Sequence, residues 1–379
     1  MIVVGMLSGT SADGLDVAVC SIEVGETVQL EVLRHAGVAW PEGLGDRVLA
    51  LLPPAPTTVE EVCAVDHALG RAAADAAVDA LDGLDGDLVV WLGQTVFHGI
   101  SDGRATGGLQ LGQPAWIAEA TGLPVVSDLR STDIAAGGHG APLASTLDAL
   151  WLAGPETRVA LNLGGIANVT VVAPHGVTAF DTGPANCWLD VVAHRATGAA
   201  YDVDGALAAR GTVDRGLLEH LLAEPYYAAP PPKTTGRELF TAPALDAAVA
   251  HAAPHIDAPG LAATLVALTA RTVADACRDA VEVVGAGGGM ANPVLRRALA
   301  EALHPIPLVS ADERGLPADA KEAVLTALLG ALTWHGVPGV LPGATGTATP
   351  RVLGRISPGH APLRLPEPAP AVRSLEVVA

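Results

Sequence analysis

Three short glycine-rich segments of this chain carry residue types suited to a phosphorylated ligand. The first is the turn SGTSADG, which begins at Ser8 and continues into Leu15 and Asp16. Hydroxyls and backbone N–H groups in such a turn suit phosphate, and Asp13 or Asp16 suits a hydrated Mg²⁺. An ordinary hairpin is the alternative interpretation. The candidate phosphate-binding residues here are Gly9, Thr10, Ser11, Ala12, Asp13, Gly14, Leu15 and Asp16.

The second segment lies in the stretch LNLGGIANVTVVAPHGVTAFDTGPANCWLD, residues 161–190. A short apolar strand is broken at Gly164 and Gly165 and then resumes with Asn168, so these three residues are candidates for a matching phosphate turn. Asp181 is expected just past a strand that ends at Phe180, and Pro184 is expected to open a helix. A carboxylate at a strand end suits proton abstraction. Capping of the following helix by Asp181 is the structural alternative, and it is compatible with catalysis.

The third segment is GAGGGMAN, residues 285–292, between an expected strand and an expected helix. The dinucleotide-binding pattern of glycines fails because Met290 occupies the third glycine position. Packing of an adenosine against Gly287, Gly288 and Asn292 fits better, with a tight helix–sheet contact as the alternative. A phosphate-binding loop of the GxxxxGK type is excluded, since the two lysines of the chain do not follow such a run.

Other polar residues offer weaker cases. His98 and Arg130 are expected in loops at strand ends, where they could orient a sugar or a carboxylate. Glu322 is a charge on an otherwise apolar helix expected over 318–334, and a solvated edge is its plain interpretation. The FDTG segment around Asp181 is also typical of aspartic proteases. Those enzymes need two carboxylates that share a proton, and a second DTG does not occur here, so only a dimeric protease would work.

The elements that must position these residues follow the same order twice. Strands are expected over 2–6, 15–24 and 28–38, a helix capped at Thr58 runs to about residue 81, and a strand over 87–92 precedes a loop GQTVFHG. The second half again shows strands around a glycine hairpin, then helices and strands. This duplicated βββαβα layout predicts an α/β fold. We place the first domain at residues 1–130 and the second at 131–379, with an insertion near 201–245.

Composition restricts the partners. The formal net charge of −20 argues against nucleic acid and against an anionic membrane surface. An anionic ligand must therefore be held by backbone N–H groups, helix N-termini and a metal ion. Four scattered cysteines and an N-terminus without a basic region predict a cytoplasmic protein rather than a secreted or membrane-spanning one.

At this point the chain resembles the anhydro-N-acetylmuramic acid kinase family, part of the superfamily of sugar kinases, actin and heat-shock chaperone ATPases. The matching segments, in order, are MLSGTSADGLD, GQTVFH, DLRSTDIAAGGHGAPL, NLGGIANVT, FDTGPANCWLD, PPKTTGRELF, GAGGGMANPVL, DAKEA and ATGTA. The resemblance implies two similar ribonuclease H-like (actin-like ATPase) domains around a central cleft. Ala185 and His139 depart from the glycine and glutamine that are usual in the family.

The resemblance also implies an activity. ATP with Mg²⁺ would phosphorylate O6 of a small amino sugar, anhydro-N-acetylmuramic acid, while water opens its 1,6-anhydro bond. Gly9 to Asp16 would form the ATP-binding turn and Asp181 would be the catalytic base. We add His98, Arg130 and Glu322 as our own candidates for contact with the substrate. We expect a homodimer. A nucleotide-gated binding module and a filament-type ATPase, both known in the superfamily, are the alternatives.

Overall fold

The chain folds into two compact units. The computed structural model describes residues 1–9, 11–101, 104–231, 233–235, 239–341 and 345–378. Unit 1 contains Met1–Trp151 and Gly315–Ala379, and unit 2 contains Leu152–Arg314. The expected domain boundary after residue 130 therefore lies inside unit 1, and the C-terminal segment, expected in the second domain, returns to unit 1. The reason is packing, because helix α12 (Lys321–Trp334) buries its apolar side chains against the first sheet.

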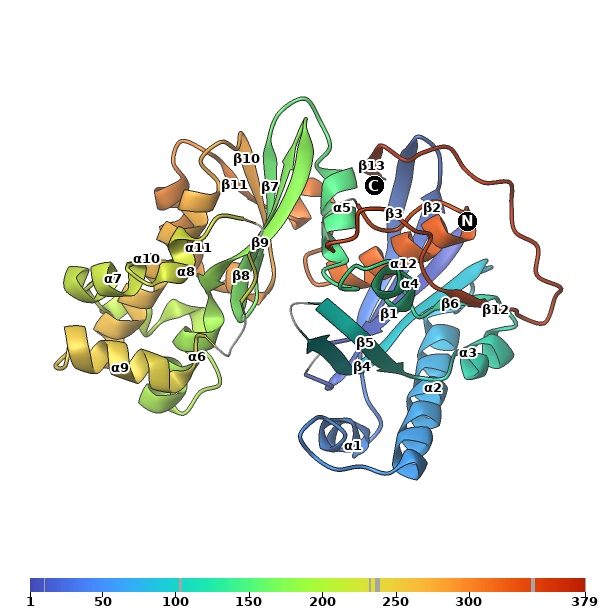
Figure 1. Ribbon diagram of the computed structural model, residues 1–379, viewed down its shortest axis with the longest axis horizontal. Helices are drawn as coiled ribbons and strands as arrows, with labels where there is room; N and C mark the ends of the chain where they lie inside the picture. Colours follow the sequence, from blue (N-terminus) through green and yellow to red (C-terminus); the bar gives the residue numbers. More distant parts are fainter. Residues whose placement is uncertain (10, 102–103, 232, 236–238, 342–344, 379) are drawn as a thin grey trace. The chain divides into compact units, whose positions relative to one another are not determined.

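Unit 1 is built on a mixed sheet of eight strands among its described residues. Their order is β12-β6-β4-β1-β2-β3-β13, and β5 pairs with β4. In Figure 1 the C-terminal strand β13, in red, lies beside the blue strand β3, with which it pairs in parallel. The strands are β1 (Ile2–Ser8), β2 (Gly14–Glu23), β3 (Thr27–Ala39), β4 (Leu88–Ser101), β5 (Arg104–Leu111), β6 (Val125–Ser127), β12 (Arg355–Ser357) and β13 (Ser374–Val378).

The helices of unit 1 cover both faces of this sheet. They are α1 (Leu44–Ala50), α2 (Val59–Leu81), α3 (Pro114–Thr121), α4 (Ser131–Ala135), α5 (Ala144–Trp151) and α12. Val3 and Leu7 of β1 pack in a core with α5 and α12, whereas Val4 and Met6 pack in a second core with α1, α2 and α3. Successive side chains of a strand point to opposite faces, so the continuous apolar run of β1 reflects burial on both sides.

Gly5 of β1 marks the closest approach of α12. A Cβ atom at this position would lie 2.2 Å from the Ala323 carbonyl oxygen and 2.5 Å from the Ala327 nitrogen. Both are backbone atoms, so the helix itself would have to move. Gly5→Ala is therefore expected to lower the free energy of unfolding by about 1–3 kcal/mol, the usual cost of overpacking.

Urea unfolding followed by tryptophan fluorescence tests this expectation, because every tryptophan except Trp188 lies in unit 1. Gly37→Ala is the matched control, since a Cβ there meets no atom of the described residues within 4 Å. We expect its stability to change by less than about 0.5 kcal/mol. Equal effects of the two substitutions would show that the approach of α12 to Gly5 is not tight.

Unit 2 contains the second mixed sheet, whose order is β11-β10-β7-β8-β9. Its strands are β7 (Arg158–Leu163), β8 (Ile166–Ala173), β9 (Gly176–Pro184), β10 (Glu282–Ala286) and β11 (Leu308–Ser310). Its α-helices are α6 (Asn186–Thr197), α7 (Arg215–Leu222), α8 (Pro225–Ala228), α9 (Ala242–Ala252), α10 (Ala258–Ala276) and α11 (Pro293–Leu303). Short 3₁₀ turns are η1 (Val203–Gly205), η2 (Ala208–Arg210), η3 (Gly288–Ala291) and η4 (Asp312–Arg314).

The two units share one strand topology. In unit 1, β1, β2 and β3 form an antiparallel meander, and β4 and β6 extend it in parallel from β1. In unit 2, β7, β8 and β9 form the same meander, and β10 and β11 extend it in parallel from β7. The predicted duplication is confirmed at the level of topology. Within the described ranges, each helix is too short or too polar to span a bilayer.

Candidate active site

Asp181 lies inside a strand and not after one. β9 continues to Pro184, with Asp181 opposite Asn168 and Gly183 opposite Ala167 of β8. Thr182 is therefore an extra residue in the pairing, which is a β-bulge. The strand was expected to end at Phe180, and that expectation is wrong because the bulge lets the pairing continue past Asp181. Bulges redirect side chains and are frequent beside active sites.

A row of polar side chains that includes Asp181 crosses three neighbouring strands of the sheet of unit 2. Asn168 lies opposite Asp181 on one side and opposite Asn162 of β7 on the other. Directly opposite residues of antiparallel strands point to the same face, so all three side chains share one face. The structure thus brings the predicted residues Asn168 and Asp181 together and adds Asn162. The sequence could have pointed to Asn162, because it is a polar residue within the apolar run 159–163 of β7.

The glycine hairpin between β7 and β8 is bound to the start of α6. The Gly165 carbonyl accepts hydrogen bonds from the Ala185 and Cys187 N–H groups, both at 3.0 Å, and the Gly164 carbonyl accepts one from the Asn186 N–H at 3.1 Å. The helix begins at Asn186, so Pro184 ends the strand and does not open the helix.

The structural alternative, in which Asp181 caps the following helix, is also wrong. Ala185 is the N-cap residue of α6, without a side-chain cap. The first N–H groups of α6 are instead satisfied by the hairpin carbonyls, which replaces a capping side chain. Asp181 Oδ2 accepts hydrogen bonds from the Thr234 hydroxyl at 2.9 Å and from the Thr235 N–H at 2.8 Å. Asp181 is therefore available for a role other than capping.

The third glycine turn lies against the end of β7. A Cβ at Gly287 would lie 2.5 Å from Asn162 Oδ1 and 2.9 Å from the Leu163 carbonyl, and φ there is +86°. Gly288 is exposed, and a Cβ built there would meet no described atom within 4 Å, so its backbone is open to a ligand. Asn292 caps α11, accepting from the Val294 N–H at 3.0 Å. Gly287 and Asn292 thus have structural duties, which the alternative of a tight helix–sheet contact anticipated.

The N-terminal turn of unit 1 is held by hydrogen bonds to Gln94, a residue that the sequence analysis did not single out. The Ser8 hydroxyl donates to Gln94 Oε1 at 2.5 Å, and Gln94 Nε2 donates to the Gly9 carbonyl at 3.1 Å. Gln94 is buried on β4. Its place in the GQTVFH segment was the available signal. GQTVFHG was expected as a loop, but it continues β4, because β5 pairs with it.

The remaining residues of this turn are held locally. Ala12 is buried and has a left-handed backbone with φ of +54°, which is uncommon for a residue with a side chain. The Ser11 hydroxyl donates to Asp13 Oδ1 at 2.8 Å, and Gly14, Leu15 and Asp16 begin β2. Thr10, also a candidate, lies outside the described residues. A backbone conformation of this kind is common at binding sites.

Gly9 offers a test of this turn. Within the described part of the chain a Cβ at Gly9 meets only the Ser11 hydroxyl, at 3.7 Å, so Gly9→Val is expected to fold normally. If the turn binds phosphate, the added side chain should keep the phosphate away from the backbone N–H groups. ATP binding should then weaken by about 10- to 100-fold, which corresponds to the free energy of one hydrogen bond to a charged group. Isothermal calorimetry measures this. Unchanged ATP affinity in a folded variant would remove the turn from the phosphate site.

The carboxyl groups of Asp16, in the turn, and of Glu322 both have a raised pKa. Desolvation, and then the charges of Asp13 and Asp319, raise the pKa of Asp16. Desolvation of its carboxyl group, and then the charge of Asp16, raise the pKa of Glu322. Among the described residues no three or more histidine, cysteine or acidic side chains gather as a metal site. The donor set fits a divalent cation only where ligand phosphates and waters complete its shell.

Arg130 and His98 lie near each other in unit 1. Desolvation, and then the charges of Arg130 and His139, lower the pKa of His98. Arg130 Nη1 donates to the Gly140 carbonyl at 2.7 Å, while its buried Nε has no hydrogen-bond partner among the described residues. Desolvation lowers the pKa of Arg130 and Glu322 raises it. The three residues expected on the substrate are thus electrostatically coupled, and the Arg130 Nε–H is left as a donor that a planar anion could satisfy.

The segment after Arg130, which begins with α4, is held by hydrogen bonds to the C-terminal part of the chain. Asp133 is fully buried and accepts from the Gly140 N–H at 2.7 Å and from the Thr345 hydroxyl at 2.8 Å. The His139 N–H donates to the Thr345 carbonyl at 2.7 Å. The segment 128–142 was expected to be the domain crossover, but these bonds hold it inside unit 1. Thr345 belongs to the ATGTA segment that supported the resemblance.

These features define a class of protein. A duplicated ribonuclease H-like unit, with glycine turns at strand ends and an aspartate beside one of them, is the architecture of the actin-like ATPase fold. Over residues 1–359 the chain matches the anhydro-N-acetylmuramic acid kinase family. It belongs to that family.

Related proteins are similar over almost the whole length. The chain is 52% identical to the anhydro-N-acetylmuramic acid kinase of Streptomyces coelicolor and 53% identical to that of Streptomyces avermitilis, each over 97% of both chains. Among solved structures it is distantly similar to an activator of 2-hydroxyisocaproyl-CoA dehydratase from Clostridium difficile. That likeness has 16% identity and a TM-score of 0.40 and covers 87% of this chain and 96% of the other.

Proposed function

We propose that the protein is an ATP-dependent kinase that opens the 1,6-anhydro ring of anhydro-N-acetylmuramic acid with water and phosphorylates O6. The products are N-acetylmuramate 6-phosphate and ADP. Family membership over almost the full length supports the reaction. The observation that carries the mechanism is the placement of Asp181 at a bulge, where Thr234 and Thr235 hold one carboxylate oxygen.

The chemistry balances with one water. Its oxygen bonds to the anomeric carbon while the bond from that carbon to O6 breaks. O6 then bonds to the γ-phosphorus, and the phosphorus–oxygen bond to ADP breaks. One proton of the water stays on the new anomeric hydroxyl, and Asp181 takes the other as general base. Phosphoryl transfer itself needs positioning and charge neutralisation more than covalent help.

Residues of unit 1 take the binding roles in this proposal. The turn from Gly9 to Asp16 receives phosphates of ATP, and Asp13 or Asp16 would hold Mg²⁺, which neutralises phosphate charge when bound. Desolvation, and then the charges of Asp13 and Asp319, raise the pKa of Asp16, and a bound cation would offset this cost of its negative charge. Arg130 binds the lactyl carboxylate of the sugar through its unpaired edge. His98 and Glu322 contact the sugar.

Mass spectrometry of the reaction in ¹⁸O-water tests the proposal. Label is expected on the anomeric oxygen of the sugar phosphate, with one ADP formed for each sugar opened. Short incubations and a control with N-acetylmuramate 6-phosphate alone account for slow exchange of the free anomeric hydroxyl. Label in inorganic phosphate would overturn the proposal and leave an ATPase. ADP release that does not depend on the sugar would favour a nucleotide-gated binding module.

The homodimer and the cytoplasmic location remain predictions. Multi-angle light scattering of the purified protein tests the first. The same measurement with ATP tests the filament-type alternative, which requires large polymers.

A further inference from the structure

A segment of three residues lies against the backbone and side chain of Asp181. These residues, Lys233 to Thr235, are called the strap here, and they belong to the insertion between α8 and α9. The Asp181 N–H donates to the Lys233 carbonyl at 3.1 Å. The Thr234 hydroxyl and the Thr235 N–H both donate to Asp181 Oδ2. Among the described residues β9 is the last strand of its sheet, and the strap lies along its outer edge.

Lys233 fastens the strap at one end. Its Nζ donates to the carbonyls of Tyr226 and Tyr227, both at 3.0 Å, and lies 4.8 Å from the centre of the Tyr226 ring. The Tyr226 hydroxyl in turn donates to the Asp181 carbonyl at 2.8 Å. Desolvation lowers the pKa of Lys233. The ammonium group of Lys233 therefore binds backbone carbonyls. A lysine that binds a phosphate would instead point its ammonium group at the ligand.

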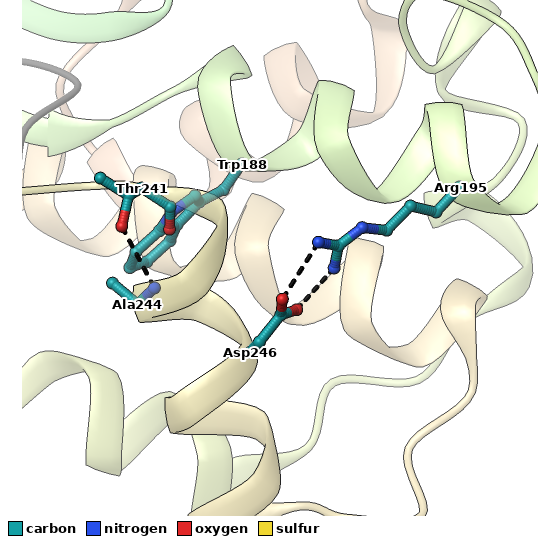
Figure 2. Close-up of polar contacts among 5 residues, drawn as sticks. All are labelled: Trp188, Arg195, Thr241, Ala244 and Asp246. Atoms are coloured by element: carbon teal, nitrogen blue, oxygen red, sulfur yellow. Dashed lines mark hydrogen bonds and ion pairs between the residues drawn. The ribbon is translucent and has the colours of Figure 1, made fainter.

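The chain beyond the strap is fastened to α6, the helix that follows β9. Figure 2 shows Trp188 of α6 beside Thr241, whose carbonyl accepts from the indole N–H at 3.0 Å. The Thr241 hydroxyl caps α9 through the Ala244 N–H at 3.2 Å, and Arg195 pairs with Asp246 through two hydrogen bonds of 2.5 and 3.1 Å. Both ends of the insertion segment that carries the strap are thus tied to elements next to Asp181.

We propose that the strap is a positioning device for Asp181, with Thr234 as its positioning residue; this inference rests on the proposed function. A general base must present one lone pair to the attacking water, and an aspartate can rotate about its side-chain bonds. Two donors on Oδ2 fix the plane of the carboxylate, and Lys233 fixes the strap that supplies them. The strap therefore contributes to turnover without touching the sugar.

Substitution of Thr234 separates positioning from binding. Thr234→Val removes the hydroxyl at constant shape and is expected to lower kcat by about 10- to 100-fold, the value of a hydrogen bond to a charged group, with the sugar KM unchanged. Thr234→Ser keeps the hydroxyl and should restore most of kcat. Thr178→Val, the same chemical change at an exposed site on β9, is the control and should stay within about twofold of wild type.

A double-substitution cycle with Asp181→Asn gives the decisive readout. If Thr234 acts through Asp181, adding Thr234→Val to Asp181→Asn should cause no further loss of kcat. Additive losses, or a raised sugar KM, would overturn the proposal and place the hydroxyl on the substrate. Lys233→Met tests the other end of the strap and should also lower kcat alone. If wild type does not open the sugar, the proposed function fails; if it does but Thr234→Val equals wild type, only the strap proposal fails.

Discussion

Asp181→Asn is expected to lose about 10²- to 10⁴-fold in kcat, the usual contribution of a general base, while ATP binding stays unchanged. Asparagine has nearly the same shape and keeps one oxygen that accepts from Thr234 or Thr235. It does not take a proton from water. Because Asp181 does not cap α6, the helix should not be disturbed. The variant should therefore fold, bind nucleotide and fail in the chemical step.

Steady-state kinetics with the anhydro sugar, together with calorimetric titration of ATP, measures both parts of this expectation. Asp275→Asn removes the same charge from an exposed ion-paired site of unit 2 and should remain within about twofold of wild type. Substantial turnover in Asp181→Asn would mean that another group accepts the proton. Lost ATP binding would instead give Asp181 a role in nucleotide binding.

Arg130→Ala is expected to raise the sugar KM by about 100-fold, with a small effect on the ATP KM. The guanidinium is mostly buried, and its Nε lacks a partner among the described residues, so a substrate carboxylate would complete a desolvated charge pair. Removal of one member of such a pair costs several kcal/mol. Initial rates over a grid of sugar and ATP concentrations give both constants.

Arg130→Lys refines this test. Lysine keeps the charge but not the planar pair of donors, so an intermediate sugar KM is expected if the fork geometry matters. Arg130 also holds the Gly140 carbonyl, and that contact is independent of substrate. Equal increases in both KM values would therefore mean that Arg130 stabilises the segment 131–142, contrary to the substrate role.

Much of the fold could be predicted because each repeated element has a local signature. The apolar run of β1 implies burial on both faces, Thr58 with Glu61 marks the start of α2, and glycines break the chain at each hairpin. These signals depend only on neighbours in the sequence. The duplicated topology could be predicted because the same order of signals occurs in both halves of the sequence.

The features that were missed depend on distant contacts. β9 extends past Phe180 because a bulge keeps it paired with β8, and the strap reaches Asp181 from 53 residues away. An apolar helix such as α12 also carries no mark of which sheet it will cover. Gln94 and Asn162 stood in segments that had already been singled out, yet their partners became evident only when neighbouring strands were placed side by side.

Because the C-terminal segment belongs to unit 1, the two units are completed in a fixed order during translation. Unit 2 lies between two parts of unit 1 in the sequence, so all of its residues leave the ribosome before α12 does. Until then the face of β1 that carries Val3, Gly5 and Leu7 lacks its covering helix. Unit 2 can therefore complete its core first, while the nascent unit 1 exposes apolar surface of the kind that chaperones bind. A released chain that ends between residues 314 and 321 should therefore contain one folded unit attached to an unfinished sheet.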